Sequence, residues 1–534
     1  MTTSFFGGNM NKKNKKTTTK TAKYYTRLKY IGISFSAIML AIFPLYLSDR
    51  YFNARHDKLN LFYFLAGVLV VATAVVYIFF DDRKKKDKID KEFFLKNFSA
   101  VDWAMIAFAV SAIISTCTSP YCSSAVTGSM GRNNGLLLIL VYTVTYFIMS
   151  RIYRQNIIVP VGVCISSALV SLLGIVNQFY WDPLNLYKGL SSPQLHKFIS
   201  TIGNRNMFSA YLCIMIPIIF MVFIYTQKRW MLWLSGSSLA FCLGGMICSN
   251  SDSSILGFGA FLVFAIILFI RDLEKMSRLF WGLLLFTVSC KVIRIFSLIM
   301  EDYSMGFGSI QKFFIYGNTY AMIAIFAVIS TVLYFLHIKR PNYYLPRCAR
   351  IIAVSVFALA FVGGLILMIY YSVYNTKAPL KGALSYFRFN DSWGTHRGFM
   401  WIRALYIFGD MSILHKIFGN GPDTFTAMMD ISGYNEELIA FRKETTDCAH
   451  NVYLNYLVTL GIAGVISYIT AIVSCVVRSV KKAFSNKYAV IFAGSVVCYG
   501  IQSIVNIDQP ITTPLFILMI TLTENQCREN REII

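Results

Sequence analysis

The chain has 534 residues, of which 56% are hydrophobic and only 14% are charged. Soluble globular proteins carry about 25% charged residues, so this composition excludes a soluble enzyme, a disordered chain and a secreted disulfide scaffold, and it indicates a polytopic membrane protein. The formal net charge is +24, but Lys and Arg cluster between apolar runs, as topology signals do. Because no nucleic-acid-binding motif accompanies this charge, we expect no nucleic-acid partner.

Apolar runs of membrane-spanning length recur along the whole chain. A spanning helix needs about 20 predominantly apolar residues. On that scale the sequence predicts an all-α, polytopic transmembrane helical bundle of about 12–14 spans. The predicted spans cover residues 30–48, 59–80, 100–117, 135–150, 157–179, 207–225, 230–249, 255–270, 279–299, 319–337, 351–374, 452–477, 488–506 and 509–523.

Basic segments orient these spans. The Lys-rich tail over residues 1–29 is polar, and we expect it to be disordered and to act as a topology anchor. All the basic segments fall on one side of the membrane if both termini are cytoplasmic, as the positive-inside rule requires. After the tail, these segments lie at residues 83–91, 151–154, 228–229, 271–278, 339–350 and 478–487.

Two long loops fall on the opposite, outer side, at residues 180–206 and 375–449. The second loop has balanced charge, and its apolar residues Met400, Trp401, Leu405 and Phe408 follow a helical spacing. We therefore expect it to fold as amphipathic helices on the outer membrane surface. The predicted organisation is a cytoplasmic tail, an N-terminal transmembrane region, a central region that includes the long loop, and C-terminal helices with a cytoplasmic tail: residues 1–29, 30–234, 235–477 and 478–534.

The strongest catalytic candidate is His450, in the string Cys448-Ala449-His450-Asn451 where the long loop enters a span. A neutral imidazole at a membrane interface can accept a proton from a sugar hydroxyl near neutral pH. The alternative is an interfacial His beside Asn451, which would cap the helix start. On position alone, the second interpretation is favoured.

Arginines near outer loops are candidate ligands for a diphosphate, because guanidinium donors match phosphate oxygens in pairs. Arg397 opens the amphipathic stretch, whereas Arg132 and Arg205 each follow a Gly- or Asn-rich turn. Each of them could instead bind lipid headgroups or snorkel. Lys291 and Arg294 lie inside an apolar run, so they face either a polar cavity or the headgroups.

Taken together, these strings resemble the O-antigen ligase and polymerase superfamily of bacterial membrane glycosyltransferases. The resemblance covers most of the chain after residue 100 and is densest over residues 235–470. It rests on an ordered set of strings: Gly131-Arg132 with Gly135, Gly203-Asn204 with Asn206, Arg397 with Trp401, Gly421 to Phe425, His450-Asn451 with Tyr453-Leu454, and Gln502 with Asn506.

The resemblance implies a GT-C-type fold that acts, without metal or other cofactor, on polyprenyl-diphosphate-linked glycans. By motif, His450 takes the role of catalytic base and Arg397 that of a cation on the diphosphate. Members of this superfamily often place a second Arg after a Ser in a mid-chain span, but this chain has Asp252 there. The second cation is therefore open among Arg132, Arg205 and Arg294.

These features predict an inverting polymerase of lipid-linked repeat units of a surface polysaccharide, located in the cytoplasmic membrane of a bacterium. Its partners would be the lipid-linked donor, the glycan acceptor, the bilayer and other polysaccharide-assembly membrane proteins. An O-antigen ligase and a protein O-oligosaccharyltransferase differ from a polymerase only in the acceptor, which the sequence leaves open. A flippase for lipid-linked oligosaccharides would also explain the spans, but not a folded outer loop that ends in His450.

Overall fold

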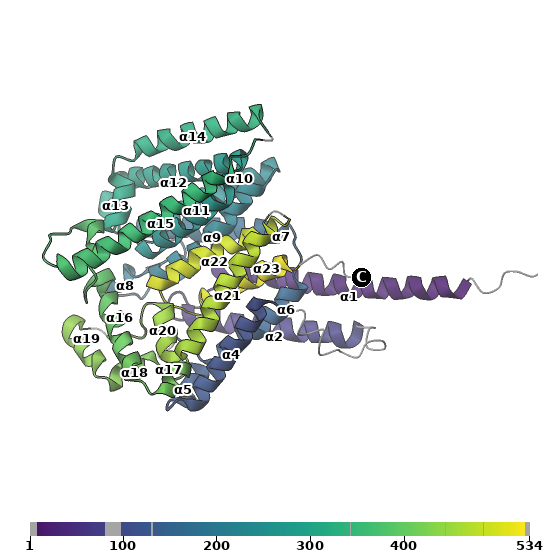
Figure 1. Ribbon diagram of the computed structural model, residues 1–534, viewed down its shortest axis with the longest axis horizontal. Coiled ribbons are helices and arrows are strands. Elements are labelled where there is room, and N and C mark those ends of the chain that lie inside the picture. The colour runs from purple at the N-terminus through teal and green to yellow at the C-terminus, as the bar shows by residue number, and fades with distance from the viewer. Residues whose placement is uncertain are drawn as a thin grey trace, which may run out of the picture.

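The computed structural model describes residues 8–80, 98–129, 132–341, 343–443, 445–483 and 485–528 of the chain, and the side chains of residues 8–22, Pro193 and Arg442 are left aside. These residues form an all-α bundle. The one sheet among them has two strands, β1 Phe198–Ile199 and β2 Gly203–Asn204, which pair antiparallel. Figure 1 shows the long helices running broadly side by side, with short helices gathered at one end.

The helices of the N-terminal half follow the apolar runs. Their bounds are α1 Gly8–Ala37, η1 Ile38–Ile42, η2 Phe43–Leu45, α2 Ala54–Phe80, α4 Ala100–Thr118, α5 Cys122–Thr127, α6 Leu136–Ile152, α7 Ile158–Gln178, α8 Ser192–Leu195, β1 Phe198–Ile199, β2 Gly203–Asn204, α9 Arg205–Tyr225, α10 Arg229–Cys248 and α11 Asp252–Phe269.

The C-terminal half alternates long helices with a block of short ones. Their bounds are α12 Leu273–Ile299, η4 Glu301–Tyr303, α13 Ser309–Tyr316, α14 Tyr320–Lys339, α15 Arg347–Ile369, η5 Tyr370–Tyr374, η6 Gly382–Phe387, α16 Trp393–Asp410, α17 Ile413–Phe418, α18 Phe425–Ile431, α19 Tyr434–Arg442, α20 Val452–Thr459, α21 Gly461–Lys482, α22 Tyr488–Gln502, η7 Ser503–Val505 and α23 Thr513–Cys527.

The predicted polytopic bundle is confirmed. Within the described residues, 12 helices are long and apolar enough to cross a membrane. Two further predicted spans correspond to the shorter helices α6, of 17 residues, and α23, of 15 residues. The structure therefore agrees with the lower end of the predicted range.

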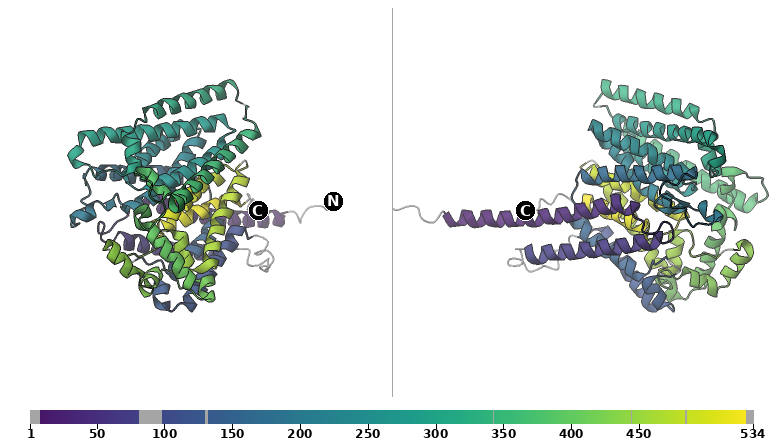
Figure 2. Two further views of the ribbon diagram at one scale, coloured as in Figure 1. Left: turned by 60° about the vertical axis from the view of Figure 1, so that its left-hand side comes forward. Right: turned by 180° about the vertical axis from the view of Figure 1, so that it is seen from behind.

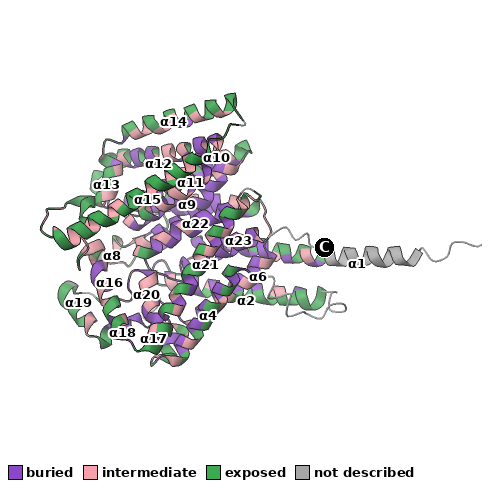
Figure 3. Cartoon of the chain, viewed as in Figure 1, coloured by how far each residue is buried: buried purple, intermediate pink, exposed green. Residues whose placement is uncertain are grey.

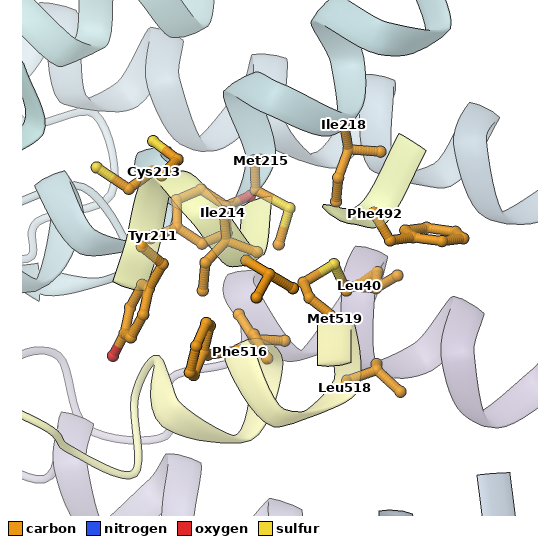
Figure 4. Packing of buried hydrophobic residues seen from close by; sticks show 14 of the residues in the cluster. Leu40, Tyr211, Cys213, Ile214, Met215, Ile218, Phe492, Phe516, Leu518 and Met519 are labelled. Carbon is orange, nitrogen blue, oxygen red and sulfur yellow. The ribbon is translucent and has the colours of Figure 1, made fainter. Parts of the chain in front are cut away.

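Helix α9 forms the centre of the bundle. All of its most apolar window is buried, because α7, α10, α11 and α22 pack around it. Figure 4 shows Tyr211, Ile214 and Met215 of α9 packed near Phe492 and Phe516 from the last two helices. A helix that is apolar on every side needs such complete coverage.

Helices α14 and α15 lie at the periphery. Their apolar windows are 6% and 0% buried, and Figure 3 shows both as mostly exposed. Exposed apolar faces of this extent are expected where lipid, and not water, surrounds the protein.

The predicted long loop folds at one end of the bundle. Helices α16 to α19 gather there with α8 and α13, and the two views of Figure 2 agree with this placement. The basic turn after α14 and the end of α23 lie at the opposite end of the bundle. Within α16, Phe399, Met400, Ala404 and Ile407 form a second small core, whereas Leu405, predicted to share the apolar face, is 51% exposed.

Two sequence predictions differ from the structure in detail. The predicted span 452–477 is broken into α20 and α21 at Gly461, whose φ is +68°. A Cβ atom there would lie 2.3 Å from the carbonyl oxygen of Ile417, so the close approach of α17 requires glycine. The tail over residues 1–29 is predicted to be disordered, but residues 8–29 are helical and form the first part of α1. The first seven residues of the tail, the basic segment 83–91 and Gly131 lie outside the described residues.

Candidate active site

Arg132 organises the end of the bundle that carries the long loop. Its side chain is only 1% exposed, and it lies 3.7 Å from Asp423, 3.5 Å from Asp447 and 3.5 Å from Asp508. It also donates hydrogen bonds to the backbone carbonyls of Asp447, at 3.1 Å, and Asp508, at 2.8 Å. A charge this deeply buried must be paired to be tolerated. Arg132 therefore ties three segments that are distant in sequence to one point.

Two of the carboxylates around Arg132, those of Asp423 and Asp447, have pKa values shifted in opposite directions. Burial raises the pKa of Asp423 to about 6, although Arg132 opposes the shift. Burial also raises the pKa of Asp447, but the charges of Arg132 and His450 outweigh it, so the pKa of Asp447 is lowered. Asp447 is thus the carboxylate held ionised beside His450.

His450 lies on the strained backbone that joins the long loop to α20. Its φ is +49°, a left-handed conformation that is uncommon for any residue except glycine. Asn451 then caps α20, because its side chain accepts from the backbone N–H groups of Tyr453, at 3.0 Å, and Leu454, at 3.1 Å. The capping role considered for Asn451 is confirmed, and it fixes the imidazole at the start of the helix.

Arg55 is a further cation at this end, and it belongs to none of the motifs identified in the sequence. It lies in the first turn of α2 and is within electrostatic reach of Asp447, Asp423 and Arg132. Nearly 400 residues separate it from Asp447 along the chain. The signal that could have found it is its position at the outer end of a predicted span, where a basic residue departs from the positive-inside pattern.

Arg397 lies near the start of α16, within electrostatic reach of Cys448 in the segment that carries His450. It follows a left-handed turn in which Gly394, Thr395 and His396 all have positive φ. Burial lowers the pKa of its guanidinium, although the nearby Tyr386, Asp252 and Cys448 act in the opposite direction. The Nε atom of Arg397 is buried without a hydrogen-bond partner among the described residues. An arginine in this state retains capacity for a ligand.

The other predicted strings meet beneath this site. Asn506 donates to the backbone carbonyl of Asn206 at 3.1 Å, and Gln502 donates to Ser253 at 3.2 Å. Ser251 in turn donates to the side chain of Asn206 at 3.0 Å. The structure thus joins the Asn206, Asp252 and Gln502 regions into one buried polar layer.

The family follows from the comparison with known proteins. A family model described as O-antigen ligase matches residues 313–469, which include both Arg397 and His450. Residues 313–469 thus carry the O-antigen ligase domain, which supports the O-antigen ligase and polymerase superfamily for this chain. No curated protein matches the chain. The superfamily comprises membrane glycosyltransferases of the ligase and polymerase type, which fits a multi-pass membrane protein with a folded loop at one end.

Arg205 and Arg294, two of the arginines considered as diphosphate ligands, contact other parts of the protein. Arg205 donates to the carbonyl of His196, at 2.7 Å, and the carbonyl of Cys248, at 2.8 Å, and further to Gln178 and Met305. It thereby clamps the 180–206 loop to α10. Arg294 contacts Tyr320 of α14. Neither arginine has a recorded contact with the Arg132 cluster.

Lys291 likewise binds backbone groups of the protein itself. Its ammonium group donates to the carbonyls of Ile315, at 3.0 Å, and Gly317, at 2.8 Å, where α13 ends. The turn at Gly421 is structural as well, since its N–H donates to Ser115 at 2.9 Å and a Cβ would lie 2.7 Å from the Ser119 hydroxyl. These contacts assign Lys291 and Gly421 to loop packing.

Asp447, Cys448 and His450 are the one group in the described part of the chain with metal-ligand geometry, since their ligand atoms lie within 4.8 Å of one another. The donor set suits a metal poorly. Burial raises the pKa of the Cys448 thiol to about 12, so it is protonated at neutral pH. Asp447 is already engaged by Arg132. The arrangement fits a carboxylate–imidazole pair better than a metal centre.

Proposed function

We propose that this protein is an inverting, metal-independent glycosyltransferase that polymerises oligosaccharide repeat units linked to undecaprenyl diphosphate. It would act at the outer face of the cytoplasmic membrane of a bacterium, with both termini in the cytoplasm. One observation carries the proposal: the Asp447–His450 pair is fixed on buried Arg132 at the loop–membrane junction, with Arg55 and Arg397 close by.

In this mechanism His450 accepts the proton of an acceptor hydroxyl while that oxygen forms a bond to the anomeric carbon of the donor sugar. The bond between this carbon and the diphosphate oxygen breaks, and the lipid diphosphate leaves from the opposite face of the sugar. Asp447 orients the imidazole and stabilises the imidazolium, as a buried carboxylate does beside a catalytic histidine.

Arg397 and Arg55 would stabilise the charge that develops on the departing diphosphate. Fixed cationic donors in a desolvated site contribute most when they face the group that gains charge in the transition state. Arg55 thereby supplies the second cation that the sequence left open after Asp252 replaced the expected arginine. Arg132 stabilises the site from below, because its charge is already balanced by three carboxylates.

The test is the size profile of surface polysaccharide from a deletion strain that carries either the wild-type protein or His450→Ala at matched protein level. We expect long polymer with the wild type and single repeat units on the lipid carrier with the variant. His337→Ala is the matched control, since His337 lies in the last turn of α14 near Glu274, at the end away from the loop.

Three outcomes would redirect the proposal. Full-length polymer with His450→Ala would remove the base and favour a flippase. Normal polymer in the deletion strain, with loss of glycan on lipid A or on protein, would identify a ligase or a protein O-oligosaccharyltransferase. Loss of transfer by the purified protein in a chelator, restored by a divalent ion, would overturn metal independence.

A further inference from the structure

A separate cavity of about 350 Å³ lies beside Arg397. Its walls come from residues 380–395, from the first residue of α11, Asp252, and from the first residue of α13, Ser309. Small-molecule sites usually occupy roughly 300–1,000 Å³, so this cavity is large enough for one or two rings but too small for a chain. Two residues of its wall, Tyr386 and Asp252, also act electrostatically on Arg397, so the cavity lies next to that arginine.

Asp252 presents acceptor capacity in this cavity. Its carboxylate accepts one hydrogen bond from the Tyr386 hydroxyl and one from the Gln311 amide, at 3.0 Å. Gln311 is fully buried, so it holds the Asp252 carboxylate from the interior of the protein. Because a carboxylate has about four acceptor positions, roughly two remain for hydroxyl groups of a ligand.

Arg388 supplies donor capacity. One of its terminal nitrogens donates to the carbonyls of Asn375 and Ala378, which fixes the guanidinium. Its Nε atom is buried and has no hydrogen-bond partner among the described residues. Asn390, Ser385 and Ser392 add short side chains that can both donate and accept. The wall therefore offers paired donors and acceptors, as a polyhydroxylated ligand requires.

Trp393 adds a rigid aromatic surface to the same wall. Its indole N–H donates to the carbonyl of Tyr386 at 2.9 Å, so the polar edge is already engaged. Its ring centroid lies 5.0 Å from that of Trp401 and 5.6 Å from that of Phe389, which fixes its orientation. An aromatic ring held in this way offers apolar contact area to the C–H face of a sugar at little entropic cost.

Other ligand classes fit this wall less well. The Asp252 carboxylate would repel a phosphate group, and a single carboxylate is too few ligands for a divalent cation. A lipid tail would displace water from the polar groups of the wall without replacing its hydrogen bonds, which is costly. A neutral, hydroxyl-rich ring satisfies both the acceptor and the donor groups.

We propose that this cavity binds a sugar residue of the lipid-linked glycan and holds it next to the diphosphate on Arg397. That the bound sugar belongs to a lipid-linked glycan rests on the proposed function. The cavity would then determine which sugar is accepted, through the pairing of its hydroxyls with Asp252 and Arg388. The arginines near His450 would recognise the diphosphate in any such lipid.

The test compares two ligands on the purified protein: the lipid-linked repeat unit isolated from the producing strain, and the same lipid diphosphate after its sugars are removed. We expect the glycosylated lipid to bind the wild type at least tenfold more tightly. Asp252→Asn and Arg388→Gln should each reduce this difference about tenfold or more, because hydrogen bonds to charged groups contribute that much. Neither variant should weaken the binding of the bare lipid diphosphate.

The controls separate this inference from the proposed function. Tyr386→Phe keeps the ring and removes one donor to Asp252, and Asp410→Asn changes an exposed carboxylate at the far end of α16. Equal binding of both lipids by the wild type, with weaker binding of both by Arg397→Gln, would overturn the sugar site and leave the proposed function standing. Loss of bare-lipid binding in Asp252→Asn, at an unchanged melting temperature, would assign the cavity to the diphosphate and overturn the inference. Binding of neither lipid by the wild type would overturn both.

Discussion

Arg132 and Arg397 both lie at the loop-bearing end of the protein, but Arg132 is buried whereas Arg397 is half-buried, and their ionic surroundings differ. Arg132 has three carboxylates within 3.7 Å and two backbone carbonyls as acceptors. The Nε atoms of both arginines lack a hydrogen-bond partner among the described residues. Arg397, however, makes no ion pair among those residues, and the carboxylate that acts on it, Asp252, accepts a hydrogen bond from Tyr386. An arginine whose charge is balanced by the protein stabilises the fold, whereas one left partly unsatisfied is available to an anionic ligand.

The largest expected effect comes from Arg132→Met. This change leaves two buried carboxylates, Asp423 and Asp508, and the half-buried Asp447 without their cation. Breaking a buried ion pair from one side costs about 3–5 kcal/mol. We expect a large fall in melting temperature and in the yield of monodisperse protein. Arg132→Lys should be intermediate, because it keeps the charge but loses the planar set of donors. An Arg132→Met protein that melts like the wild type would contradict the structural role.

Arg397→Gln should act in the opposite way. We expect about ten- to hundredfold weaker binding of the lipid diphosphate, since charge-assisted hydrogen bonds contribute about 1.5–3 kcal/mol. The melting temperature should stay unchanged or rise, because a half-buried and incompletely paired charge is removed. Both quantities can be measured on one purified preparation.

Arg403→Gln is the matched control on the same helix. Arg403 pairs with Asp391, at 3.0 Å, and Glu437, at 3.1 Å, both of which are substantially exposed. Its replacement should leave ligand binding intact and cost at most about 1 kcal/mol of stability. If Arg397→Gln destabilised the protein more than it weakened binding, the contrast between the two arginines would fail.

Much of this contrast could not be predicted from the sequence. The length of the apolar runs predicts the spans, and the strings around Arg397 and His450 predict the loop–membrane junction. The ion pairs of Arg132 join positions 291 to 376 residues apart, and no local pattern specifies them. The break at Gly461 likewise depends on the approach of Ile417 from a different helix. The roles of Arg132 and Arg55 emerge only when the segments meet in space.

The smallest expected effect is the pH dependence of Asp423→Asn. Asp423 has a pKa of about 6 in the folded protein, above the value of about 3.9 of an unfolded chain. The contribution of its protonated form to stability is therefore complete below about pH 4 and is lost as the pH rises through 6. We expect the melting temperature of the wild type, relative to that of the variant, to fall between pH 4 and pH 7. A difference that stayed constant or rose over this range would contradict the burial of Asp423 beside Arg132.

The most direct test of the central claim measures transfer by the purified protein with the lipid-linked repeat unit as donor and acceptor. The melting temperature and the affinity for the lipid diphosphate are measured for wild type and His450→Ala, so that the rates are compared between equally folded proteins that bind the lipid equally well. We expect His450→Ala to lower the transfer rate by about 10²–10⁴-fold, the usual contribution of a general base. Transfer at the wild-type rate by this variant would show that His450 only joins the loop to the helix, and the proposed mechanism would be wrong.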